Sequence, residues 1–175
     1  MGKITFVLGG ARSGKSGYAV QLAQESGKKV AFIATCPYFD EEMEERIRKH
    51  KEERPPEWGC FEEFKDIAPL IKRLDQEYDY GFVLIDCLTL FTSNLVLDEF
   101  DEEEIKKRTQ NMLDELKKAS FDAVLVANEV GLGIIPEYPV SRKFRDYAGR
   151  VNQLVAKSAD EVFFTVAGIP TKIKT

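Results

Sequence analysis

The sequence predicts an α/β protein whose mostly parallel sheet carries helices on both faces. Two observations predict this class. Continuous apolar runs, which are typical of parallel strands buried on both faces, recur along the chain. Segments with the apolar spacing of helices separate these runs, as in repeated strand and helix units. The chain has 175 residues, which suits a single domain over residues 1–175. The expected strands are residues 4–8, 30–34, 82–86, 123–127 and 161–166.

The first apolar run leads directly into a glycine-rich motif with the pattern G-x-x-x-x-G-K-S. Between a strand and a helix, this pattern is that of a phosphate-binding loop, whose backbone N–H groups surround phosphate oxygens. We expect Lys15 to reach the β- and γ-phosphates of a nucleoside triphosphate and Ser16 to bind Mg²⁺. A chance glycine-rich turn is the alternative, and the context of strand and helix argues against it. The motif comprises Gly9, Gly10, Ala11, Arg12, Ser13, Gly14, Lys15 and Ser16.

The ends of two further runs are expected beside this loop, because ligands of open α/β sheets lie at the carboxyl ends of the strands. The second run ends in Ala34, which is followed by Thr35 and Cys36. The third ends in Asp86, at the place of the carboxylate that holds Mg²⁺ in P-loop NTPases. Many buried parallel strands end in aspartate, so this metal role depends on the upstream loop. Together these features predict the P-loop NTPase fold.

A charged helix is predicted over residues 40–54, where two prolines end it. It carries His50, the only histidine of the chain. One interpretation is a partly buried histidine that packs against the core. The other is chemical, because neighbouring cations suit phosphate and favour the neutral imidazole that can attack phosphorus. Spacing alone leaves both interpretations open.

Composition argues against several classes of function. The net charge of −5 argues against general binding to nucleic acid. No apolar run approaches the ~20 residues that span a bilayer, and the N-terminus lacks the features of a signal peptide. We therefore expect a cytoplasmic protein without a membrane span. An odd number of cysteines without a C-x-x-C pair predicts neither a disulfide framework nor a zinc site. Cys36, Cys60 and Cys87 are each expected to be small buried side chains.

Five segments together resemble the bifunctional adenosylcobinamide kinase/adenosylcobinamide-phosphate guanylyltransferase family. The phosphate-binding loop alone is generic, whereas the helix with the histidine and two C-terminal segments are specific to this family. The resemblance runs in order through nearly the whole chain. The segments are residues 9–16, 33–35, 46–55, 128–136 and 144–153.

The resemblance implies an enzyme of cobalamin biosynthesis. Such an enzyme phosphorylates the aminopropanol hydroxyl of adenosylcobinamide with ATP or GTP and then transfers GMP from GTP, which gives adenosylcobinamide-GDP. It implies that His50 becomes guanylylated, that Lys15 and Ser16 hold nucleotide phosphates, and that Mg²⁺ is required. Asp86 stands where a relative has glutamate, which keeps the charge but shortens the reach. Further nucleotide contacts are implied at Ala34, Thr35, Cys36, Lys51, Glu52, Glu53, Arg54, Glu62 and Asp86.

The resemblance also implies a homotrimer with sites near subunit boundaries and a corrinoid substrate. Two other functions stay open. One is a monofunctional P-loop kinase of another small-molecule alcohol, in which His50 is only structural. The other is a nucleotide-binding switch or scaffold, although the chain lacks the Asn-Lys-x-Asp motif with which switch GTPases read guanine.

Overall fold

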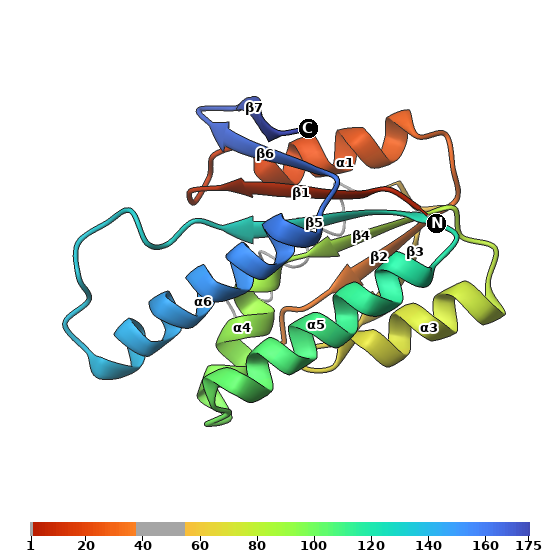
Figure 1. Ribbon diagram of the computed structural model, residues 1–175. Helices are drawn as coiled ribbons and strands as arrows, with labels where there is room; N and C mark the ends of the chain where they lie inside the picture. Colours follow the sequence, from red (N-terminus) through yellow and green to blue (C-terminus); the bar gives the residue numbers. More distant parts are fainter. Residues whose placement is uncertain (1, 38–54) are drawn as a thin grey trace.

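A seven-stranded sheet forms the centre of the computed structural model, which describes residues 2–37 and 55–175 (Figure 1). The strand order is β3-β2-β4-β5-β1-β6-β7, and every neighbouring pair is parallel except β6 and β7. The strands are β1 (Ile4–Gly9), β2 (Val30–Ala34), β3 (Gly59–Glu62), β4 (Phe82–Asp86), β5 (Asp122–Asn128), β6 (Glu161–Val166) and β7 (Ile169–Lys174).

Helices cover both faces of this sheet. One face packs against α1, and the other packs against the layer of α3, α4, α5 and α6 (Figure 1). The predicted mostly parallel sheet with helices on both faces is therefore confirmed. The helices are α1 (Lys15–Glu25), α3 (Ile67–Glu77), α4 (Leu88–Leu97), α5 (Glu102–Lys118) and α6 (Pro139–Ser158).

Two hydrophobic clusters explain why the strand sequences are apolar throughout. Successive side chains of a strand point to opposite faces, so Phe6 joins the larger cluster while Val7 joins the cluster beneath α1. On β5, Leu125 and Val126 divide in the same way. Because both faces are covered, neither set of alternate residues needs to be polar. Packing on both faces thereby holds the strands in place, so that their carboxyl ends lie together at one edge of the sheet.

Some expectations are corrected by the structure. The expected burial of all three cysteines is wrong, because only Cys87 is buried, whereas Cys36 is half-buried and Cys60 is exposed. The segment Gly59–Glu62, which is not among the expected strands, forms an edge strand of the sheet. The expected helix over residues 40–54 lies outside the described residues. Within the part of the chain that the structure describes, no helix has the length and apolar character needed to cross a membrane.

Candidate nucleotide-binding site

The phosphate-binding loop leaves β1 at Gly9 and enters α1 at Lys15. Two positions of this loop require glycine. A Cβ on Gly9 would lie 2.5 Å from the Ser13 Oγ and 2.6 Å from the Thr165 carbonyl oxygen. Gly14 has a φ of 92°, a left-handed conformation that glycine adopts without strain. The Gly168 N–H donates to the Ser13 carbonyl oxygen at 2.8 Å, which ties the loop to the turn between β6 and β7.

Lys15 folds back over this loop. Its Nζ donates to the Gly10 carbonyl oxygen at 3.0 Å, and only 9% of the residue is exposed. Burial lowers the pKa of Lys15 because it removes water from the ammonium group, and the negative charge of Asp86 opposes that shift. A partly desolvated cation in a loop of backbone N–H groups is suited to a polyphosphate.

The carboxyl ends of three strands bring predicted site residues to one edge. Ala34 at the end of β2 pairs with Glu62 of β3 on one side and with Asp86 of β4 on the other. Asp86 also acts electrostatically on Lys15. The structure thus places Asp86 between the β3 edge and the phosphate-binding loop.

A buried hydrogen-bond network fixes this edge. The Thr35 hydroxyl donates to the Cys87 carbonyl oxygen at 2.6 Å and accepts from the Cys87 N–H at 2.8 Å. The Asn94 Nδ2 donates to the carbonyl oxygens of Thr35 and Phe64, at 2.9 and 3.0 Å. Thr35 is fully buried, and its hydroxyl, N–H and carbonyl all bond within the protein, so contact with a ligand would come from its neighbours. The peptide bond between Asp86 and Cys87 is cis.

A hollow of about 440 Å³ lies beside the phosphate-binding loop. Sequence reasoning assigned no role to Glu129, which enters this hollow from the end of β5, although its place after an apolar strand run was a usable signal. The lining residues are Gly10, Ala11, Arg12, Ser13, Glu129, Leu132 and residues 164–167.

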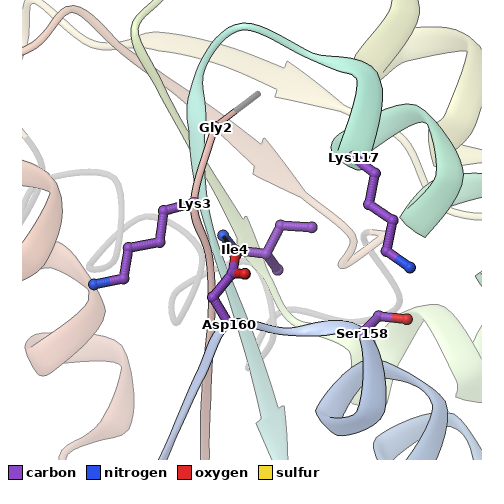
Figure 2. Close-up of a pocket in the computed structure, with 6 residues that line it drawn as sticks. All are labelled: Gly2, Lys3, Ile4, Lys117, Ser158 and Asp160. Atoms are coloured by element: carbon purple, nitrogen blue, oxygen red, sulfur yellow. Dashed lines mark hydrogen bonds between the residues drawn. The ribbon is translucent and has the colours of Figure 1, made fainter. Parts of the chain in front are cut away.

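A second hollow of about 440 Å³ lies at the opposite edge of the sheet, around the start of β1 (Figure 2). Lys3, Lys117 and Asp160 line it. The Asp160 carboxylate accepts a hydrogen bond from the Ile4 N–H at 2.7 Å, so it serves the backbone. Because ligands of open α/β sheets bind at the carboxyl ends of the strands, we place the functional site at the first hollow and the phosphate-binding loop.

Comparison with known proteins identifies the family. The family model described as cobinamide kinase / cobinamide phosphate guanyltransferase matches residues 5–173. The chain belongs to this family. It is 40% identical over 169 residues to the bifunctional adenosylcobalamin biosynthesis protein CobP of Pseudomonas aeruginosa, covering 96% of this chain and 95% of that protein. It is 39% identical over 180 residues to the bifunctional adenosylcobalamin biosynthesis protein CobU of Escherichia coli, covering 96% and 98%.

Solved structures agree on the fold. A RadB recombinase superposes with a TM-score of 0.54 at 19% identity, over 93% of this chain and 73% of that one. A KaiC-like protein from Pyrococcus horikoshii superposes with a TM-score of 0.52 at 14% identity, over 93% and 70%. At such low identity the likeness concerns the fold alone, and it confirms the P-loop NTPase fold.

The residues that the family resemblance implies fall into two groups. Those of the loop at residues 9–16 and of the strand ends, Ala34 to Cys36, Glu62 and Asp86, meet at one edge of the sheet. His50, Lys51, Glu52, Glu53 and Arg54 lie outside the described residues. Their assigned roles stay predictions.

Proposed function

We propose that this member of the cobinamide kinase / cobinamide phosphate guanyltransferase family catalyses both reactions of its family name, within one domain of residues 1–175. It phosphorylates the aminopropanol hydroxyl of adenosylcobinamide with ATP or GTP and then transfers GMP from GTP, which gives adenosylcobinamide-GDP. The observation that carries the proposal is the family match over residues 5–173, which includes a phosphate-binding loop of the required shape.

In the kinase step the acceptor hydroxyl oxygen attacks the γ-phosphorus, and the bond from that phosphorus to the oxygen of the leaving diphosphate breaks. Lys15 and the backbone N–H groups of residues 10–16 hold the phosphates and offset the negative charge that moves to the leaving group. The low exposure of Lys15 strengthens this interaction, because fewer waters compete for the ammonium group.

In the transfer step the His50 imidazole attacks the α-phosphorus of GTP, and pyrophosphate leaves. An oxygen of cobinamide phosphate then attacks the same phosphorus and releases His50. Two displacements replace one difficult transfer, which is the general advantage of covalent catalysis. We assign Lys51 and Arg54 to the leaving pyrophosphate, and Ala34, Cys36, Glu52, Glu53 and Glu62 to nucleotide contact.

Mg²⁺ fits the residues at the loop. Ser16 is a half-buried residue in the first turn of α1, and the negative charge of Asp86 reaches Lys15 in the same loop. Two oxygen ligands of this kind, completed by phosphate and water, suit a cation that binds few protein groups. Bound there, Mg²⁺ would neutralise phosphate charge. We further propose a cytoplasmic homotrimer with its sites near subunit boundaries.

The decisive experiment uses GTP labelled on the α-phosphate. The purified chain is incubated with Mg²⁺ and this GTP, denatured, and tested for bound label, with His50→Asn and the loop variant Lys15→Met alongside. We expect label that is acid-labile and alkali-stable in the wild type and absent from His50→Asn. A folded wild type that phosphorylates cobinamide yet takes no label would refute the guanylylated histidine, and one that neither takes label nor phosphorylates cobinamide would favour the kinase of another alcohol.

A further inference from the structure

We propose that the Glu129 carboxylate is the general base of the kinase step and takes the proton of the acceptor hydroxyl. This inference rests on the proposed function and assigns a residue for which the sequence offered no role. Its starting point is the hollow beside the phosphate-binding loop, where Glu129 and Gly10 share the wall.

Among the carboxylates at this edge, Glu129 is the one whose strand lies directly beside β1, from which the phosphate-binding loop leaves. β5 lies directly beside β1, and the Glu129 N–H continues their pairing by donating to the Gly9 carbonyl oxygen at 2.9 Å. The backbone of Glu129 is therefore one strand spacing, about 4.8 Å, from the start of the loop. Asp86 lies two strand spacings from β1, roughly 10 Å, and Glu62 lies four, roughly 19 Å.

The Glu129 carboxylate is oriented by its own turn. One oxygen accepts a hydrogen bond from the Gly131 N–H. A Cβ on Gly131 would lie 2.9 Å from that oxygen, so glycine leaves room for the arrangement. Among the described residues, the other oxygen has no hydrogen-bond partner. One oxygen is thus anchored while the second remains available to a proton, and the half-buried side chain stays accessible from the hollow.

The hollow has the composition of a binding site. Arg12 is the only other charged side chain among its described lining residues. The hydroxyls of Ser13 and Thr165 belong to the same wall, are buried, and have no hydrogen-bond partner among the residues that the structure describes. A volume of about 440 Å³ accommodates the hydroxyl-bearing arm of a large substrate whose remainder stays outside.

In this step the hydroxyl oxygen bonds to the γ-phosphorus, the bond from phosphorus to the diphosphate oxygen breaks, and ADP or GDP leaves. The hydroxyl proton passes to the free oxygen of Glu129 and from there to water. Asp86 is less suited to this role, because its charge acts on Lys15 and the proposed function assigns it to Mg²⁺.

The test compares Glu129→Gln with the matched variant Glu137→Gln, which removes an exposed carboxylate from the same loop. The glutamine amide oxygen can still accept from the Gly131 N–H, so the turn is preserved while the base is lost. With cobinamide and ATP as substrates, formation of ADP and of cobinamide phosphate gives kcat and KM separately, and a nonhydrolysable ATP analogue gives the nucleotide Kd.

For Glu129→Gln we expect kcat to fall about 10²- to 10⁴-fold, which is the usual contribution of a general base. The KM for cobinamide and the nucleotide Kd should stay within about 3-fold of wild type, because only the transition state uses the proton transfer. Glu129→Asp should recover part of kcat, and Glu137→Gln should match the wild type.

Two results would overturn the inference. One is a kcat of Glu129→Gln within about 3-fold of wild type. The other is a loss of kcat that is matched by equal losses of thermal stability and nucleotide binding, which would make Glu129 structural. A wild type that forms no cobinamide phosphate at all would refute the proposed function itself, so the two failures are distinguishable.

Discussion

Lys15 couples nucleotide binding to the uptake of protons. Burial lowers its pKa below the ordinary 10.5, whereas a bound polyphosphate favours the charged ammonium and raises the pKa again. Nucleotide binding at alkaline pH should therefore take up protons. In the free protein, the free energy of unfolding should rise with pH through the interval between the lowered pKa and 10.5, because there the unfolded chain binds more protons than the folded one.

Calorimetry measures this uptake. Titrations with a nonhydrolysable GTP analogue at alkaline pH, in buffers of different ionisation enthalpy, should give apparent enthalpies that vary with the buffer. Lys15→Arg is the matched control, because a guanidinium stays charged and can bind without taking up a proton. Enthalpies of the wild type that are independent of the buffer would contradict the linkage.

Prediction from sequence was uneven at the scale of single residues. The phosphate-binding loop could be located because its glycines and lysine occupy a fixed pattern between a strand and a helix. The burial of Cys87 was predicted correctly, whereas that of Cys36 and Cys60 was predicted wrongly, because residue type was the only guide. Cys60 lies on the four-residue edge strand β3, where alternate side chains face outward, so it is exposed. Burial raises the pKa of Cys87 to about 12, and the negative charge of the adjacent Asp86 adds to the rise.

At the scale of elements, Asn94 of α4 joins two segments at the nucleotide edge. It is 4% exposed, and its amide donates to carbonyl oxygens after β2 and after β3. Asn94→Leu keeps most of the volume but leaves both carbonyls unpaired in the interior. Because each such loss costs about 1–3 kcal/mol, we expect the free energy of unfolding to fall by roughly 2–6 kcal/mol.

Urea denaturation measures this change. The control is Asn111→Leu on the exposed face of α5, which should stay within about 0.5 kcal/mol of wild type. Equal stability of the two variants would show that the Asn94 hydrogen bonds contribute nothing. Nucleotide affinity should fall with Asn94→Leu as well, because the segments that bear Thr35 and Glu62 lose their common anchor.

The strands and helices differ in how clearly their sequences predict them. Five strands have continuous apolar runs and were predictable, and four of them, β1, β2, β4 and β5, are buried along nearly their whole length. β3 has four residues with alternating exposure, so it gives no run. α4 carries buried polar residues whose side chains bond within the protein, such as the Thr92 hydroxyl to the Leu88 carbonyl oxygen at 2.8 Å. Its sequence therefore lacks a simple polar face, and a helix could not be distinguished from a packed loop.

At the scale of the whole molecule, strand order was beyond sequence reasoning. β5 lies between β1 and β4 although it follows both in the chain, so Glu129 meets the phosphate-binding loop. Local patterns carry no information on which strands pair across long separations. The placement of Glu129 therefore required the structure, whereas the existence of its strand did not.

An apolar loop projects from the molecule between β5 and α6 (Figure 1). Ile134 is 93% exposed and Leu132 is 81% exposed, with Ile135 and Tyr138 exposed nearby. Exposed apolar clusters on this scale mark interaction surfaces. We assign the loop to contacts within the proposed homotrimer, because its base at Glu129 also lines the hollow beside the phosphates and would place that hollow near a subunit boundary.

Light scattering after gel filtration should give a mass of three times the 19.9 kDa chain. The double variant Ile134→Asp and Ile135→Asp should shift the protein toward monomers, because burying carboxylates against an apolar partner costs several kcal/mol per site. Leu97→Asp, at an exposed leucine that ends α4 and lies outside the projecting loop, should stay trimeric. A monomeric wild type would refute the trimer. A double variant that stays trimeric would exclude the projecting loop from the contacts that hold the trimer.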